Sequence, residues 1–133
     1  MVGSNSLRSP PKFLNMKKPK RTTLNNQLDK LFSEIIRSRG KCERCNRVDD
    51  TLQTSHVFSR SHLSVRWDFD NAFCFCASCH WWWHKNPPYT KDCSIKILGE
   101  DVYDELVKRK EQICKRSIEN LIEMRDSFKE MVK

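Results

Sequence analysis

The chain has 133 residues, of which 38% are apolar and 32% are charged, a composition that suits one compact soluble domain with a short arm. No run of about eighteen apolar residues is present, so the sequence predicts no membrane span, and without an apolar leader we expect a cytoplasmic protein. The cysteines number seven, which is odd, and in a reducing compartment such a density indicates metal binding rather than disulfides.

The positive charge is concentrated in the first third of the chain. Residues 1–41 hold ten lysines and arginines against two acidic residues, whereas the rest of the chain holds 15 of each sign. A concentrated basic segment is typical of a protein that binds a polyanion, because each neutralised phosphate releases counterions. Residues 1–22 contain three prolines and no apolar period, so we expect a disordered basic arm. The alternative is a solvated tail that only aids solubility.

From residue 23 the sequence changes to a helical period. Six apolar residues fall on one face of the predicted helix: Leu24, Leu28, Leu31, Phe32, Ile35 and Ile36. Thr22 or Thr23 would cap its start, and Gly40 would end it. Residues 41–88 are irregular and rich in cysteine and histidine. Within them we expect short strands over 52–58 and 72–75, and a helix over 79–85 that ends before Pro87.

The remaining residues are mostly helical by pattern. Residues 89–100 fit either a strand or a short helix that ends at Gly99. Asp101 then caps a predicted long helix to about residue 133, whose apolar positions recur at near-heptad spacing with interruptions at Lys110 and Ser117. Such a helix either folds back on its own domain or pairs with a second copy of the chain. We therefore treat residues 101–133 as a packing or dimerisation element.

Two pairs of cysteines have the spacing of a metal site. Cys42 and Cys45 form one Cys-x-x-Cys pair, and Cys76 and Cys79 form the other. Two intervening residues allow both thiolates of a pair to reach one tetrahedral zinc ion at about 2.3 Å. Four protein ligands close the coordination shell, so the sequence predicts a structural Zn²⁺ that stabilises a section with little apolar material. Cys74 is an alternative to Cys76, which we favour because it completes the second pair.

A second group of residues lies between and just beyond these pairs: His56, Asn71, His80 and His84. Histidines four residues apart on a helix point both imidazoles the same way, which suits a divalent metal ion. A histidine on the preceding hairpin can face that ion and deprotonate a water molecule at neutral pH.

In order and spacing, these four residues resemble the His-Asn-His signature of the HNH (ββα-metal) endonuclease superfamily, and the cysteine pairs are similar to those of its zinc-containing branch. The resemblance implies that His56 is the general base, that Asn71 orients the hairpin loop, and that His80 and His84 hold a catalytic Mg²⁺ or Mn²⁺. Many HNH enzymes have Asp or His before the base as a further ligand, where this chain has Ser55. The ion would then be held by His80, His84, water and DNA phosphates.

A narrower resemblance covers about residues 24–106. The stretches LDKLFSEIIR (28–37), SHVFSR (55–60) and RWDFDN (66–71) look like the phage NinG (lambda Rap) recombination family. That resemblance implies an endonuclease specific for branched DNA, such as Holliday junctions, D-loops and flaps, in a bacterial host cell. The predicted fold is α+β: a zinc-stapled HNH finger in a domain spanning 23–100, with a leading helix and a long C-terminal helix.

Some basic and aromatic residues are candidates for contacts with DNA. The basic candidates are Lys17, Lys18, Lys20, Arg21, Arg60 and Arg66. Arg60 and Arg66 flank the hairpin loop and are equally well read as solvated arginines. Trp81, Trp82 and Trp83 cannot all face one core at 100° per residue, so at least one should be exposed and able to stack on an unpaired base. We expect two of them, and Trp67, to pack in the core.

Two other classes of protein fit parts of the sequence. One is a non-catalytic, zinc-containing DNA-binding module, and the other is a zinc-dependent protein-interaction module of treble-clef type. The pair His80 and His84 discriminates against the first, because a zinc ion that already has four cysteine ligands needs no further imidazoles. In the second, the basic arm would be incidental.

Overall fold

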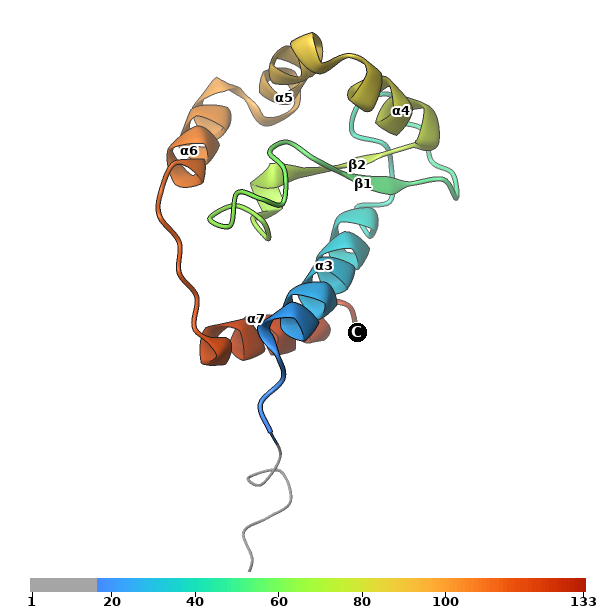
Figure 1. The fold of residues 1–133 in the computed structure, drawn as a ribbon. Coiled ribbons are helices and arrows are strands. Elements are labelled where there is room, and N and C mark those ends of the chain that lie inside the picture. The colour runs from blue at the N-terminus through green and yellow to red at the C-terminus, as the bar shows by residue number, and fades with distance from the viewer. Residues whose placement is uncertain (1–16) are drawn as a thin grey trace, which may run out of the picture.

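The computed structural model of the protein describes residues 17–133. Its elements, in chain order, are α3 (Arg21–Arg37), β1 (Gln53–His56), η1 (Phe69–Asn71), β2 (Ala72–Phe75), α4 (Ala77–Lys85), η2 (Pro87–Tyr89), α5 (Thr90–Leu98), α6 (Glu100–Lys110) and α7 (Ile118–Met131). The fold is mixed and mostly helical, with one small antiparallel sheet of two strands, which confirms the predicted α+β class (Figure 1). In the described part of the chain, no helix is long and apolar enough to cross a membrane.

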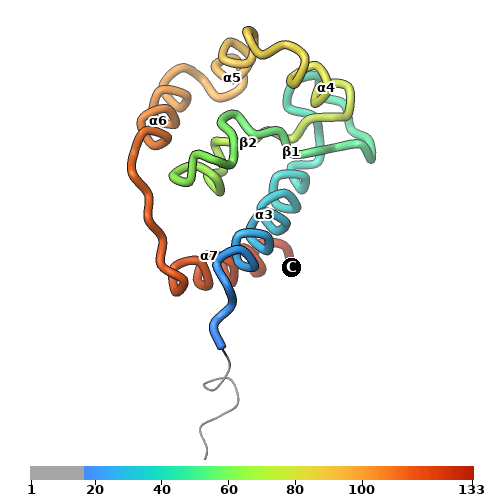
Figure 2. The backbone as a smooth tube through the Cα atoms, viewed as in Figure 1, coloured from blue at the N-terminus to red at the C-terminus, as the bar shows by residue number. Residues whose placement is uncertain are grey.

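The helices after β2 follow one another around the sheet. In the tube view, α4, α5 and α6 curve around the loop that joins β1 to β2, and the segment after α6 brings α7 back against α3 (Figure 2). Arg109 of α6 holds this arrangement to η1, because its guanidinium pairs with Asp68 at 2.6 Å and with Asp70 at 3.0 Å. Helices α3 and α7, the first and last of the described chain, lie side by side.

β2 divides the core into two clusters because both of its faces are buried. Ala72 and Cys74 belong to the cluster shared with α3 and α7, whereas Phe73 and Phe75 belong to the cluster shared with α4. The first cluster also contains Leu24, Leu28, Phe32, Ile36, Trp67, Leu121 and Phe128. The second contains Cys42, Cys76, Cys79 and Trp83. Trp67 is in the core, as the sequence predicted.

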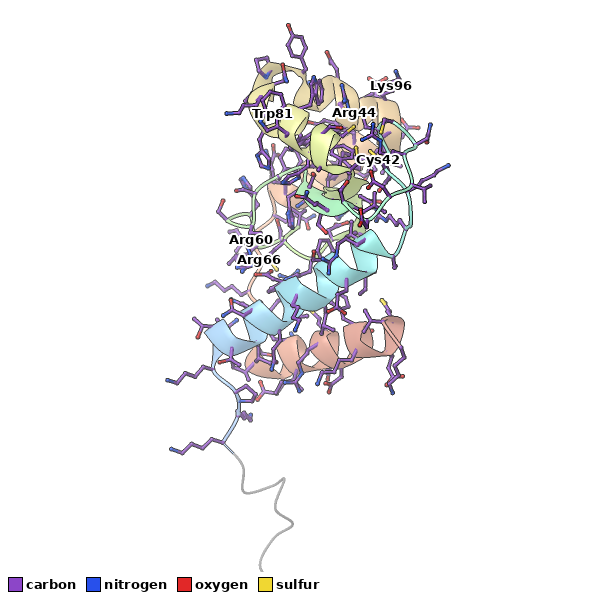
Figure 3. All side chains as sticks on the ribbon, turned by 90° about the vertical axis from the view of Figure 1, so that its right-hand side faces the viewer. Cys42, Arg44, Arg60, Arg66, Trp81 and Lys96 are labelled. Atoms are coloured by element: carbon purple, nitrogen blue, oxygen red, sulfur yellow. The ribbon has the colours of Figure 1, made fainter. Side chains whose placement is uncertain are left out.

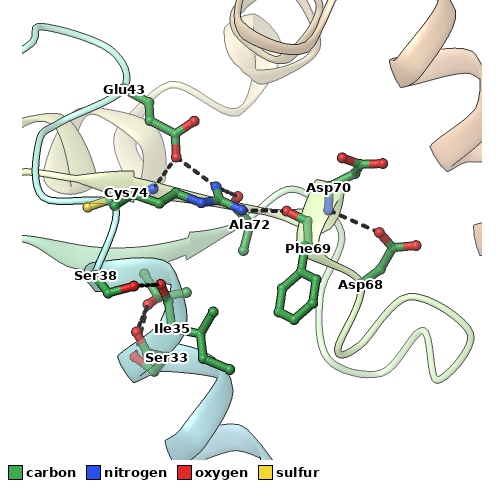
Figure 4. A network of polar contacts seen from close by, with 11 residues as sticks. Ser33, Ile35, Ser38, Glu43, Asp68, Phe69, Asp70, Ala72 and Cys74 are labelled. Atoms are coloured by element: carbon green, nitrogen blue, oxygen red, sulfur yellow. Dashed lines mark hydrogen bonds and ion pairs between the residues drawn. The ribbon is translucent and has the colours of Figure 1, made fainter. Parts of the chain in front are cut away.

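A polar network occupies the edge of β2 that β1 leaves free (Figure 4). The backbone N–H of Glu43 donates to the carbonyl of Cys74 at 2.8 Å, and the carboxylate of Glu43 accepts from the backbone N–H of Cys74 at 2.9 Å. Arg39 donates to Glu43 at 2.7 Å and to the carbonyls of Ala72 and Phe69 at 2.9 Å and 2.8 Å. This edge of the sheet is therefore covered, and the exposed edge is that of β1.

Helix α3 begins earlier than the sequence predicted. Lys20 is its extended N-cap residue, and the backbone N–H of Leu24 donates to the Lys20 carbonyl at 3.0 Å. A cap at Thr22 or Thr23 was therefore wrong, because both residues lie within the first turn of the helix. Arg21 and Thr22, assigned to the arm, are helical, and residues 1–16 of the predicted arm lie outside the described residues. The helix ends before Gly40, as predicted.

The C-terminal region contains three helices where we expected an ambiguous segment and one long helix. Residues 90–98 are helical, and Gly99 follows with φ of +89°, a conformation that favours glycine and lets the chain turn into α6. The predicted long helix is broken over residues 111–117. Ser117 caps the next helix by accepting from the backbone N–H of Asn120 at 3.0 Å. The break allows Leu121 to reach α3, which one straight helix would prevent.

The apolar stripe assigned to dimerisation is partly used within the chain. Leu121 and Phe128 are buried against α3, and Leu106 of α6 is also fully buried. Ile113, another position of the predicted stripe, is 91% exposed in the break between α6 and α7. Part of the heptad pattern therefore reflects packing of α7 on α3, whereas Val102, Ile113 and Met131 stay exposed, so dimerisation remains a prediction.

Because α7 holds α3 through buried side chains, Leu121→Ala should destabilise the protein by about 2–5 kcal/mol. The matched control is Ile113→Ala, which removes an exposed side chain and should change the free energy of unfolding by less than about 0.5 kcal/mol. Urea denaturation followed by circular dichroism measures both. Equal stabilities of the two variants would contradict the packing described for α7.

Candidate functional site

A cleft of about 690 Å³ runs along the exposed edge of β1. One wall is α3, which contributes Asp29, Ser33 and Arg37, spaced four residues apart and so on one face of the helix. The opposite wall is α4, which contributes His80 and His84. The floor is the edge of β1, including its last residue, His56. Three of the four predicted catalytic residues therefore line one cleft.

The fourth, Asn71, holds the loop that follows His56. It is fully buried, its side-chain oxygen accepts from the backbone N–H of Phe58 at 2.8 Å, and its side-chain nitrogen donates to the Phe58 carbonyl at 2.9 Å. Its own carbonyl accepts from the backbone N–H of Val57 at 2.9 Å. The amide of Asn71 thus replaces a strand pairing at the point where β1 ends, and this restrains the backbone next to His56.

The environment of His56 favours the neutral imidazole. Its ring stacks on Phe32, with 5.8 Å between ring centroids. Burial lowers the pKa of His56 below its usual value, and the positive charges of Arg60 and Arg66 lower it further, while Asp29 acts in the opposite direction. A neutral ring has a free nitrogen lone pair, so His56 can accept a proton at neutral pH.

His80 and His84 form a close pair one helical turn apart. Their ring centroids are 4.6 Å apart and the rings are nearly perpendicular. Nδ1 of His80 lies 2.6 Å from the hydroxyl of Ser55, which is buried on β1. Burial, and then the charge of His84, lowers the pKa of His80, which keeps that imidazole neutral. Ser55, where a further metal ligand is common in HNH enzymes, is therefore engaged with His80.

Arg60 and Arg66 both bind Asp29 in the wall of the cleft. Arg66 donates to the two carboxylate oxygens at 3.1 Å and 2.7 Å, Trp67 donates at 2.8 Å, and Arg60 donates at 3.2 Å. Burial alone would raise the pKa of Asp29, but the hydrogen bonds from Arg66 and Trp67 outweigh it and hold that pKa low. The side chain of Arg66 is mostly buried, whereas that of Arg60 is 60% exposed. Arg60 is the better placed of the two to meet a ligand in the cleft.

The other basic residues predicted to bind DNA lie apart from the cleft lining. Lys17, Lys18 and Lys20 precede α3, and Arg21 is its first residue, whereas the cleft is lined by the later part of that helix. Lys18 forms an ion pair with Glu119 of α7. Arg37 in the cleft wall was not singled out from the sequence, because an arginine in the last turn of a helix is ordinary.

The four predicted zinc ligands form one cluster. The sulfur atoms of Cys42, Cys45, Cys76 and Cys79 all lie within 4.8 Å of one another, so they can hold a metal ion such as zinc. The sulfur atoms of Cys45 and Cys76 are 3.7 Å apart. A tetrahedron with zinc–sulfur bonds of about 2.3 Å has edges of about 3.8 Å, so the separation of Cys45 and Cys76 matches such a site.

The backbone and nearby side chains support this cluster. Asn46 adopts a left-handed φ of +66°, and its N–H donates to the Cys42 carbonyl at 2.8 Å, which closes the turn that carries the first pair. Burial opposes ionisation of Cys76, but hydrogen bonds from Ser78 and the Cys79 backbone lower its pKa to about 6. Burial raises the pKa of Cys79 to about 12, although Arg44 donates to its sulfur at 3.4 Å. Metal binding would have to displace the proton of the Cys79 thiol.

Cys74 is not part of the cluster, because β2 ends at Phe75 and the chain turns into α4 at Cys76. Cys74 is buried among the residues between the sheet and α3, while Cys76 lies beyond the strand as the N-cap of α4.

The three tryptophans of α4 differ in exposure, as expected. Trp83 is buried against Phe73 and Phe75, Trp82 is half-buried, and Trp81 is 64% exposed.

No protein-family model, no curated protein and no solved structure matches the chain. The resemblance to the HNH and NinG families rests on the motif residues alone.

The cysteine cluster predicts which thiols are needed for zinc. Protein purified under reducing conditions should contain about one zinc ion per chain, as a closed four-thiolate site implies. Cys76→Ala should lose the metal and much of the fold, because structural zinc contributes on the order of 10 kcal/mol. Elemental analysis measures the zinc content.

Cys74→Ala is the matched control, because Cys74 lies only two residues away but is buried in the other core cluster, with α3 and α7. This variant should retain zinc. Loss of zinc from Cys74→Ala together with its retention in Cys76→Ala would overturn the ligand assignment.

Proposed function

We propose that the protein is a metal-dependent DNA endonuclease of the HNH type that hydrolyses phosphodiester bonds. The observation that carries the proposal is the convergence of His56 from β1 with His80 and His84 from α4 on one open cleft. A zinc site with four cysteines has no use for these imidazoles. A non-catalytic zinc module therefore leaves their convergence unexplained, whereas a hydrolytic site requires a base and a pair of metal ligands.

His80 and His84 are the residues that would hold a Mg²⁺ or Mn²⁺ ion. When Nδ1 of His80 carries its proton and donates to Ser55, Nε2 has the lone pair that a metal ion needs. Such an ion, when bound, draws charge from the phosphate and stabilises the leaving 3′ oxygen. Ser55 is then an orienting residue for His80, and water and the DNA phosphate would complete the coordination shell.

His56 is the proposed general base. Stacking on Phe32 and the clamp that Asn71 forms on the following loop restrict the ring. Because burial and Arg60 lower its pKa, the ring is neutral at physiological pH and can accept a proton from the attacking water. The proton then resides on the imidazole until it passes to solvent through the open side of the cleft.

The cleft also offers contacts for the DNA backbone. Arg37 and Arg60 line it, and Arg60 is exposed enough to exchange part of its ion pair with Asp29 for a phosphate. The lysines before α3 extend the basic surface beyond the cleft. The family resemblance favours branched DNA, such as Holliday junctions, D-loops or flaps. Cutting two opposing strands of a junction would need two copies of this chain, since the described residues of each copy provide one such cleft.

Incubation with labelled linear, flapped and four-way DNA, with Mg²⁺ and then with Mn²⁺, tests the proposal. We expect nicking of the branched substrates by the wild type. His56→Ala should be slower by about 10²–10⁴-fold, the usual effect of losing a general base, with unchanged zinc content and DNA affinity. Full activity of the purified variant would remove His56 from the mechanism. DNA binding without cleavage by the wild type would favour the binding module.

The environment of His56 also predicts the pH dependence of cleavage. A general base works when neutral, so the low pKa of His56 should move the acid limb of the rate profile below the usual histidine value of about 6.5. Arg60→Ala removes a positive charge that lowers this pKa, so its acid limb should shift to higher pH. Rates at saturating DNA give the profile. Arg47→Ala, an exposed arginine outside the cleft, is the control, and identical acid limbs in both variants would contradict the prediction.

A further inference from the structure

A second groove, of about 940 Å³, lies between the first cysteine pair and α5, and the proposed hydrolysis does not use it. We name it the α5 groove, defined by Lys41, Arg44, Trp82, Tyr89, Asp92 and Lys96. In Figure 3, Arg44 and Lys96 are labelled at the upper right, whereas Arg60 and Arg66 of the cleft are labelled lower and to the left. At 100° per residue, Trp82 projects from the side of α4 opposite to His80 and His84. The helix therefore separates the two grooves.

The α5 groove combines aromatic rings with positive charge. The Arg44 guanidinium lies 3.7 Å from the centroid of the Trp82 ring, a stacking distance, and the arginine is itself exposed. Tyr89 is 59% exposed, so its ring is accessible to a ligand. One face of Trp82 is covered by Arg44, so the surfaces free to stack on a planar ligand are Tyr89 and the outer side of Arg44.

The charges of the α5 groove fit a strand that has both phosphates and bases. Lys41, Arg44 and Lys96 are cationic and exposed. Of the two carboxylates in the lining, Glu43 is neutralised by Arg39 at 2.7 Å. Asp92 is the other carboxylate, and it can accept a hydrogen bond from the amino group of a base. Asp92 would repel a chain of phosphates alone, whereas it can form a hydrogen bond with the base of a nucleotide.

We infer that the α5 groove binds unpaired nucleotides of a DNA strand, with a base stacked on Tyr89 and phosphates on Lys41 and Lys96. Single-stranded DNA is bound in this way in general, by aromatic stacking along a basic groove. The inference deepens the proposed nuclease function, because it gives a branched substrate a site for the strand that leaves the duplex. Trp81, exposed and 6.0 Å from the Lys85 ammonium, lies on the part of α4 between the two grooves.

The test measures binding of a short fluorescent oligo-dC strand, without added Mg²⁺ or Mn²⁺, by fluorescence anisotropy. Tyr89→Ala should weaken binding by about 5-fold or more, since stacking of one base is worth about 1–3 kcal/mol and 1.4 kcal/mol is a factor of ten. An abasic strand of equal length should bind Tyr89→Ala and the wild type equally. Ile113→Ala controls for removal of an exposed apolar side chain. Zinc content and the urea midpoint verify that each variant is folded.

The contribution of charge is measured separately with Lys96→Glu. The slope of log K against log salt should become shallower by about 0.7, the value for one phosphate contact on a single strand. Lys129→Glu on α7 makes the same change of charge on the other side of the molecule from α5 and should leave the slope unchanged (Figure 1).

Failure of the groove and failure of the nuclease give different results. Normal strand binding by Tyr89→Ala and Lys96→Glu, or an equal loss on the abasic strand, overturns the groove even if the wild type cuts DNA. Absence of any strand binding by the wild type overturns it as well. Weakened strand binding in both variants supports the groove even if the wild type cuts no DNA, in which case only the nuclease proposal fails.

Discussion

Consecutive residues of β1 serve opposite faces of the sheet, since Ser55 pairs with Phe73 and His56 with Ala72. Ser55 therefore points toward α4, where it meets His80, and His56 points toward α3, where it stacks on Phe32. A slip of one residue in this short pairing would exchange the two side chains and dismantle the cleft. Two features hold the register. Alternate residues of β2 are buried on opposite faces of the sheet, and Asn71 hydrogen-bonds to the loop after β1.

Helix α4 depends on the cysteine cluster as well as on the sheet. It has only nine residues and no side-chain cap, so it would be marginal alone in water. Cys76 at its N-cap and Cys79 in its first turn hold one end of the helix, and Trp83 packs against Phe73 and Phe75. The same helix presents His80 and His84 to the cleft. A metal bound by the cysteines would thus position the imidazoles without touching them, by fixing the helix that carries them.

The sequence predicted those parts of the structure in which local pattern and burial agree. The apolar face of α3, the strand at 72–75 and the four clustered cysteines follow from spacing alone, because each spacing is imposed by one helix, one strand or one tetrahedron. The break between α6 and α7 was missed, since a heptad pattern continues across Ser117 whether or not the helix does. Asp29 and Arg37 were missed because a polar stripe on α3 looks like a solvated face until β1 and α4 are packed opposite it.

The separation of the two grooves by α4 limits the form of DNA that can fill both. An α-helix with its side chains is about 10–12 Å across, and a strand that passes from the His80 and His84 side to the Trp82 side must turn around it. Duplex DNA has a persistence length of about 150 bp, so a bend of that sharpness is costly. A single strand has no such stiffness. DNA that lies in the cleft as a duplex can therefore reach the α5 groove only if it changes from paired to unpaired near α4, and such a change distinguishes a branched molecule from a linear duplex.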